Sequence, residues 1–156
     1  MEEGLKLDPG SLSPLTLAFV GDGVFDLIIR TKVVMAGANR PVKRIHRDKA
    51  DRVNAHAQAE MAKVIAPLLT EEEAAILKRG RNTHTATVAK HQSIADYRLA
   101  TGLEALCGYL YMKGEMARLM ELIEAGMKDR GENDEVRSEP IEEIFNAGAK
   151  TDEGQK

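Results

Sequence analysis

The sequence predicts an all-α fold. Helix-favouring Ala, Leu, Met, Glu and Lys dominate its 156 residues, whereas Trp is absent and aromatic residues amount to 4%. Alternating β-branched runs joined by Asn-Gly turns, which would indicate a sheet, are missing. With 43% hydrophobic residues, the chain can form one compact domain with a core of its own. We therefore expect packed helices over residues 13–128, after a polar lead-in of residues 1–12 and before an acidic, partly disordered tail of residues 129–156.

The first predicted helix runs from Pro14 to about Met35 and stops at Gly37. Ser13 can cap its N-terminus, and Pro14 suits the first helical position, where no backbone N–H is needed. Apolar side chains leave no clear polar face over about four turns of this helix. This pattern predicts a helix that is surrounded by other protein.

Asp22 lies in the middle of this apolar helix. A buried carboxylate there costs several kcal/mol unless it is paired, hydrogen-bonded or bound to a metal. Gly21 and Gly23 flank it, although each destabilises a helix interior by roughly 1 kcal/mol relative to Ala. Their presence suggests close approach by another backbone or a ligand. A buried Asp22 paired with an Arg remains the alternative from this stretch alone.

Two further helical regions follow in the middle of the chain. The first is expected from about Val42 to Ile65, strongly charged at its start and rich in Ala towards its end at Pro67. Thr70, with Glu73 three residues later, then forms a capping-box pattern that predicts a short helix ending near Gly80.

Positive charge is concentrated in this part of the chain. Residues 129–156 contain nine acidic and four basic residues, a net charge of −5, so residues 1–128 carry a net charge of +2. Between positions 40 and 92, eleven Lys and Arg residues stand against six Asp and Glu. Because local charge decides where a polyanion docks, the total charge of −3 does not exclude nucleic acid binding.

The segment Arg79–Ser93 has no helical period and is predicted to be a loop. Its Arg, Asn, Thr, His and Lys side chains can donate to phosphates and 2′-hydroxyls without reading bases, although a plain polar surface loop remains the alternative. His84 and His91 lack a Cys or acidic partner at a recognisable spacing, which argues against zinc.

The next predicted helix, Asp96–Met112, carries a second acid, Glu104, among apolar side chains. Two carboxylates in one cleft repel each other, and a divalent cation is the usual way in which both stay ionised. Magnesium fits better than zinc, because the expected ligands are oxygens. The lone Cys107 is expected to be a small core residue, and an amphipathic helix over about Glu115–Met127 ends the domain.

Three motifs occur together and in order: FVGDGVFD at residues 19–26, Lys-Arg-Gly-Arg-Asn at residues 78–82, and ATGLEALCGYLY at residues 100–111. In these motifs the chain resembles bacterial Mini-ribonuclease III, the short branch of the ribonuclease III family, over roughly Leu12–Met127. The resemblance implies an all-α ribonuclease III endonuclease domain that forms a two-fold homodimer. It also implies magnesium-dependent cleavage of double-stranded RNA without an appended double-stranded-RNA-binding domain, the substrate being the stem of the precursor of 23S ribosomal RNA.

Carried over by position, the resemblance assigns Asp22 and Glu104 as catalytic residues and magnesium ligands. Full-length ribonuclease III has two further acids, at the positions of Ala18 and Thr101 here, and the Mini-III branch shares their absence. Metal-assisted in-line attack would expel the 3′-oxygen and leave a 5′-phosphate. The expected phosphate and sugar contacts are Arg79, Arg81, Asn82, His84 and Lys90.

Two other classes of protein are weighed beside the nuclease. One is a non-catalytic RNA-binding protein with a ribonuclease III fold; such proteins usually lose the acids, whereas Asp22 and Glu104 are both present. The other is a helical interaction module whose acids are merely salt-bridged. A single Cys excludes an internal disulfide and suits a reducing cytoplasm, and we expect neither a signal peptide nor a membrane span.

Overall fold

A computed structural model describes residues 7–37, 41–83 and 93–128 of the chain. The helices in order are η1 (Pro9–Ser11), α1 (Pro14–Ala36), α2 (Val42–Val53), α3 (Ala55–Ile65), η2 (Ala66–Leu68), α4 (Glu71–Arg81), α5 (Ile94–Met112) and α6 (Met116–Lys128). No strand occurs in these ranges, which confirms the all-α prediction. None of the helices is long and apolar enough to cross a membrane. The predicted tail of residues 129–156 lies outside the described residues.

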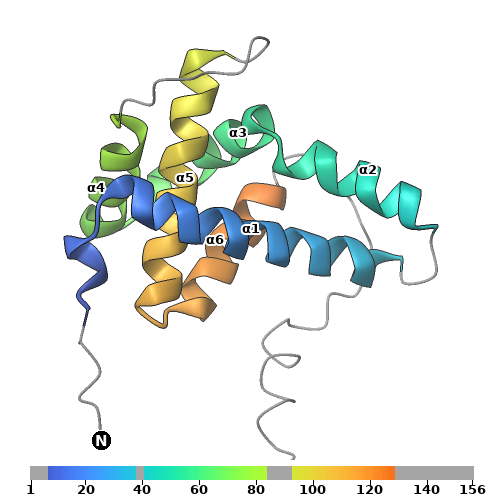
Figure 1. Cartoon of the computed structure of the whole chain (residues 1–156), viewed down its shortest axis with the longest axis horizontal. Helices are drawn as coiled ribbons and strands as arrows, with labels where there is room; N and C mark the ends of the chain where they lie inside the picture. Colours follow the sequence, from blue (N-terminus) through green and yellow to red (C-terminus); the bar gives the residue numbers. More distant parts are fainter. Residues whose placement is uncertain (1–6, 38–40, 84–92, 129–156) are drawn as a thin grey trace, which may run out of the picture.

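Helix α5 is the centre of the bundle. It packs against α1, α3, α4 and α6, while α2 packs against α1 and α3. Figure 1 shows α1 lying across α5, with α2 beside the C-terminal half of α1. Three leucines of α5 are almost fully buried, and Cys107 is 1% exposed, as predicted for a small core residue. The fold therefore surrounds α5 with four other helices.

The local signals in the sequence place the ends of α1 correctly. The Ser13 hydroxyl accepts a hydrogen bond from the backbone N–H of Thr16, and Gly37 caps the C-terminus. The expectation that protein surrounds this helix on all sides is wrong for the single chain. Leu15, Phe19 and Leu27 are 45%, 83% and 55% exposed. One face of α1 packs on α5, and a second apolar face is left uncovered.

The predicted helical region from Val42 to Ile65 is confirmed, and it consists of two helices, α2 and α3. They meet at Asn54, whose backbone is extended and whose side-chain oxygen accepts a hydrogen bond of 2.8 Å from the N–H of Ala57. Asn is a preferred N-cap residue, so this break follows from an ordinary capping preference. The single-turn helix η2, which contains Pro67, then ends the region.

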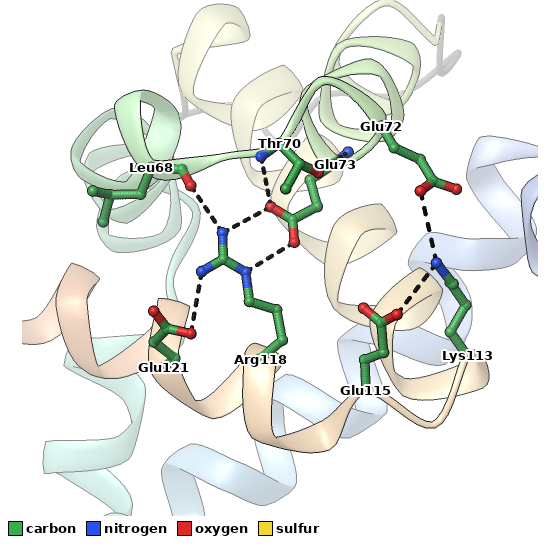
Figure 2. Close-up of polar contacts among 8 residues, drawn as sticks. All are labelled: Leu68, Thr70, Glu72, Glu73, Lys113, Glu115, Arg118 and Glu121. Carbon is green, nitrogen blue, oxygen red and sulfur yellow. Dashed lines mark hydrogen bonds and ion pairs between the residues drawn. The ribbon is translucent and has the colours of Figure 1, made fainter.

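A polar cluster fixes the start of α4 against α6 (Figure 2). The capping box is present as predicted: Thr70 accepts from the N–H of Glu73, and the Glu73 carboxylate accepts from the N–H of Thr70. The same carboxylate, on a residue 5% exposed, also accepts two hydrogen bonds of 2.9 and 3.0 Å from Arg118 of α6. Arg118 additionally donates to the carbonyl oxygen of Leu68 at 2.8 Å. This cluster joins η2, α4 and α6, although Glu73 and Arg118 are 45 residues apart in the chain.

Helix α4 extends one residue beyond the predicted end, through Arg81. The prediction of a loop beginning at Arg79 is therefore wrong for its first three residues. Tertiary contacts explain the extension: the Arg79 guanidinium donates to the carbonyl oxygens of Gly10 and Leu12, both at 3.3 Å. The last turn of α4 is thus held against the N-terminal segment.

Candidate active site

Helices α1 and α5 touch through their backbones at two glycines. A Cβ atom on Gly21 would lie 1.6 Å from the carbonyl oxygen of Glu104, and one on Gly108 would lie 2.0 Å from the carbonyl oxygen of Leu17. No side chain fits at either position, so glycine is required for this crossing. Of the predicted approach by a backbone or a ligand, the approach by a backbone is confirmed at Gly21. At Gly23 an added Cβ would meet nothing within 4 Å, so no backbone of the described residues approaches there.

This crossing brings the two predicted acids together. Asp22 directly follows Gly21, and Glu104 is the residue whose backbone Gly21 contacts. Asp22 is exposed, contrary to the expectation of a buried acid, and it forms no hydrogen bond or ion pair with the residues that the structure describes. The alternative of an Asp22–Arg pair is therefore not realised in the described part of the chain.

Glu104 lies in a different environment and is partly buried. Burial, and next the negative charge of Asp22, raise the pKa of the Glu104 carboxyl from its ordinary value of 4.5 to about 7. A hydrogen bond from the Gln58 side chain acts in the opposite direction. The pair thus combines an exposed carboxylate with one that resists ionisation, an arrangement that a bound cation would relieve.

The donor set fits magnesium. No group of three or more His, Cys, Asp or Glu residues in the described ranges could hold a metal. Ala18 has no donor, and the Thr101 hydroxyl donates to the carbonyl oxygen of Tyr97 at 3.1 Å. The site therefore offers two carboxylates, Asp22 and Glu104. Magnesium is commonly held by one or two carboxylates together with water and substrate phosphates, whereas structural zinc takes four Cys, His or acidic ligands.

Asp26, one turn after Asp22, has other partners. Its carboxylate is 2.7 Å from the Lys49 ammonium of α2 and also accepts a hydrogen bond from Arg30. Asp26 therefore joins α1 to α2 and does not add a third carboxylate to the pair.

Three of the five predicted RNA contacts lie at the C-terminal end of α4. Arg79 donates to backbone carbonyls of the N-terminal segment, and Arg81 donates to the side-chain oxygen of Asn82 at 3.3 Å. The other two, His84 and Lys90, lie outside the described residues.

The end of α4 is close to the acids along α5. A Cβ on Gly80 would lie 2.8 Å from the Cα atom of Gly102, two residues before Glu104. The basic end of α4 therefore crosses α5 within one turn of Glu104, on a different side of that helix.

Sequence reasoning did not select Gln58, which lies on α3. Its side chain is 3% exposed and lowers the pKa of the Glu104 carboxyl. A signal was present, because Gln58 stands between two buried alanines in an Ala-rich helix, where a polar side chain is unexpected.

Comparisons with known proteins agree with this fold. Residues 15–115 match the Ribonuclease III domain. The Mini-ribonuclease 3 of Thermoanaerobacter sp. (strain X514) is 50% identical over 118 residues, which cover 76% of this chain and 82% of that protein. The Mini-ribonuclease 3 of Clostridium tetani is 40% identical over 139 residues, covering 85% and 92%. The crystal structure of protein FN1578 from Fusobacterium nucleatum is similar with a TM-score of 0.69 and 28% identity, covering 77% of this chain and 95% of that one.

A helical domain with two acids on crossing helices and a match over residues 15–115 defines an endoribonuclease of the ribonuclease III type. Such enzymes cleave double-stranded RNA and depend on a divalent metal. Within that class, the chain belongs to the Mini-ribonuclease 3 family.

Proposed function

We propose that this chain hydrolyses double-stranded RNA with a magnesium ion held by Asp22 and Glu104, and that its substrate is the stem of the 23S ribosomal RNA precursor in the cytoplasm. The observation that carries the metal site is the convergence of the two carboxylates where α1 and α5 touch. The substrate assignment rests on the Mini-ribonuclease III resemblance of the three motifs, and the one Cys suits a reducing compartment.

The two acids have different tasks. Exposed Asp22 can reach a ligand from solvent without rearrangement, while partly buried Glu104 supplies a carboxylate that is fixed by its surroundings. A magnesium ion bound there would lower the pKa of a water molecule and stabilise negative charge on the scissile phosphate. In-line attack of water would form a new bond to phosphorus as the bond to the 3′-oxygen breaks, which would leave a 5′-phosphate and a 3′-hydroxyl. No side-chain nucleophile is required, in agreement with the burial of Cys107.

Positive and hydrogen-bonding groups near the acids would hold the duplex. A-form RNA presents phosphates and 2′-hydroxyls, which can be bound without reading base edges. The end of α4 crosses α5 within one turn of Glu104, so we expect groups there to contact the backbone of a duplex bound at the acids. The proposed contacts are Arg79, Arg81, Asn82, His84 and Lys90.

A two-fold dimer would cover the exposed apolar face of α1. Phe19 projects from this face and is 83% exposed, which is unusual for so large an apolar side chain. Next to it, an apolar groove of about 300 Å³ is lined by residues of α1 together with Tyr111 and Met116. A second copy can insert its Phe19 into this groove and receive the first copy's Phe19 in return. Because Asp22 lies on the same side of α1 as Phe19, the two acid pairs would flank the interface, one for each RNA strand.

The test is cleavage of a long double-stranded RNA and of a 23S precursor stem, with and without magnesium. Asp22→Asn and Glu104→Gln should each reduce magnesium-dependent cleavage by at least about 100-fold, because each removes a charged ligand. The matched control is Glu60→Gln on α3, an exposed acid paired with Lys63, which should cleave as the unmodified protein does. Binding of duplex RNA without cleavage under any divalent metal would favour the non-catalytic alternative.

A further inference from the structure

Helix α2 carries a group of cations on its outer face. Its sequence contains five Lys and Arg residues against two Asp residues. Lys43, Arg44 and Arg47 are exposed, and none of their charged groups forms an ion pair or hydrogen bond with a residue that the structure describes. We call these three side chains the basic face of α2. Lys43 and Arg47 are four residues apart and repel each other, so an anionic partner would stabilise this helix.

The opposite face attaches α2 to the bundle. Ile45 and Val53 pack against the hydrophobic core, and the Lys49 ammonium lies 2.7 Å from the Asp26 carboxylate of α1. Positions 45, 49 and 53 follow one another at intervals of four, so they share one side of the helix. Because α2 packs against α1 and α3 through this side, the basic face points away from the bundle.

Helix α6 ends beside the two helices that support α2. The Glu124 carboxylate of α6 is 3.5 Å from the Lys32 ammonium in the C-terminal half of α1, and Gly126 packs against Met61 of α3. Figure 1 shows the last turn of α6 between α1 and α3. The chain that continues after Lys128 therefore starts close to the helices on which α2 packs.

That continuation has the opposite charge to the basic face. Residues 132–143, the acid-rich segment, contain six acidic residues and one Arg. The fifteen residues from the end of α6 to position 143 reach at most about 50 Å, whereas the twelve residues of α2 span about 18 Å. The acid-rich segment is thus long enough to lie along α2 of the same chain.

We propose that the acid-rich segment, residues 132–143, docks on the basic face of α2 in the same chain. This inference is independent of the proposed magnesium site. Among anions that could bind this face, the acid-rich segment is favoured because its attachment to α6 makes the contact intramolecular and raises its effective concentration. Exposed ion pairs are individually weak and are screened by salt, so the docking is reversible and salt-dependent.

The experiment places a spin label at Ser138→Cys in the full-length chain and follows backbone amide signals by NMR. Cys107 is 1% exposed, so the introduced cysteine reacts selectively. The label should broaden the amide signals of α2 in 10 mM salt but not in 1 M salt, because the Debye length falls from about 30 Å to about 3 Å. Helix α4 is the internal control, since it lies at the other end of α1 from α2 in Figure 1, and its signals should stay sharp. Unbroadened α2 signals in 10 mM salt would overturn the proposal.

Charge variants test whether the basic face makes the contact. Lys43→Gln, Arg44→Gln and Arg47→Gln are combined in one variant, which should abolish the broadening of α2. Gln is a comparable helix former, so circular dichroism should show an unchanged helix content. Lys78→Gln, which removes an exposed cation from α4, is the matched control and should keep the broadening.

A second variant leaves α2 unchanged. It replaces the six acids of residues 132–143 by their amides and should abolish the broadening equally. Broadening of α2 that persists in either charge variant would overturn the proposal, because the contact would then not depend on these charges.

Two other occupants of the basic face give different results. Isotope-labelled chains without a spin label are mixed with spin-labelled chains that carry no isotope. Broadening of α2 in this mixture alone would assign the contact to a second copy. Duplex RNA is the other candidate. If the α2 variant binds duplex RNA more weakly while the spin label leaves α2 of the unmodified chain sharp, the basic face belongs to RNA and the proposal is refuted.

Discussion

Replacing Glu104 by Gln should stabilise the metal-free protein at pH 8. Burial, with the charge of Asp22, raises the pKa of this carboxyl from 4.5 to about 7, so the folded protein disfavours the ionised form. A difference of about 2.5 between the unfolded and folded pKa values corresponds to at most about 3 kcal/mol of lost stability. Gln has the same shape and carries no charge, so the variant avoids this penalty.

The stability advantage of Glu104→Gln should depend on pH. Because the folded pKa is the higher one, the folded state binds more protons than the unfolded state between pH 4.5 and about 7. The contribution of Glu104 to the free energy of unfolding therefore falls as the pH rises through this window. Above the window, the cost of the ionised carboxylate in the folded state is fully present. The stability advantage of Glu104→Gln should be near zero at pH 4.5 and largest at pH 8.

Thermal unfolding followed by circular dichroism in EDTA measures this advantage. For a folded domain of this size, 3 kcal/mol corresponds to a melting-temperature gain of up to about 10 °C. Asp22→Asn is the second arm and should give a smaller gain, because it removes only the lesser of the two causes. A Glu104→Gln protein that melts at or below the unmodified protein at pH 8 would refute the conclusion that the fold disfavours this charge.

Three further outcomes test the fold and the assembly. Gly21→Ala should destabilise the protein by about 3 kcal/mol in urea unfolding, because its Cβ would lie 1.6 Å from a backbone oxygen of α5. The control is Gly23→Ala, whose Cβ would meet nothing within 4 Å. It should be neutral or stabilise the protein by up to about 1 kcal/mol. Phe19→Ala removes the exposed aromatic side chain and should lower the association constant of the proposed dimer by roughly 100-fold in sedimentation equilibrium. An unchanged association constant would contradict the proposed interface. Glu73→Gln should lose about 2–3 kcal/mol at pH 7. The hydrogen bonds from Arg118 hold the pKa of Glu73 below 4.5, so this loss should disappear as the pH falls through that lowered value; a loss of equal size at pH 3 and pH 7 would argue against an ionic contribution.

Local signals in the sequence predicted local structure well. Ser13 with Pro14, and Thr70 with Glu73, act within four residues, so their hydrogen bonds can be read from spacing alone. Asn54 carried an equally clear capping preference, but the surrounding helix-forming residues concealed the break between α2 and α3.

Contacts between distant residues could not be predicted in this way. Arg118 binds Glu73 across 45 positions, and no periodicity relates the two. Likewise, the apolar pattern of α1 indicates that its faces are to be buried, but it does not say whether this chain or a second copy covers them. The exposed Phe19 shows that the described part of this chain leaves one face of α1 uncovered.

The candidate site combines both kinds of information. Asp22 and Glu104 stood out because each is an acid in an apolar helix, yet only the contact of Gly21 with the backbone of Glu104 explains why they meet. A larger residue at position 21 would destabilise the fold, because its side chain has no room against the backbone of α5, and it would also separate the two acids. Glycine there holds two like charges close together in the metal-free protein. The crossing thus carries an electrostatic repulsion that a cation in the proposed site would offset.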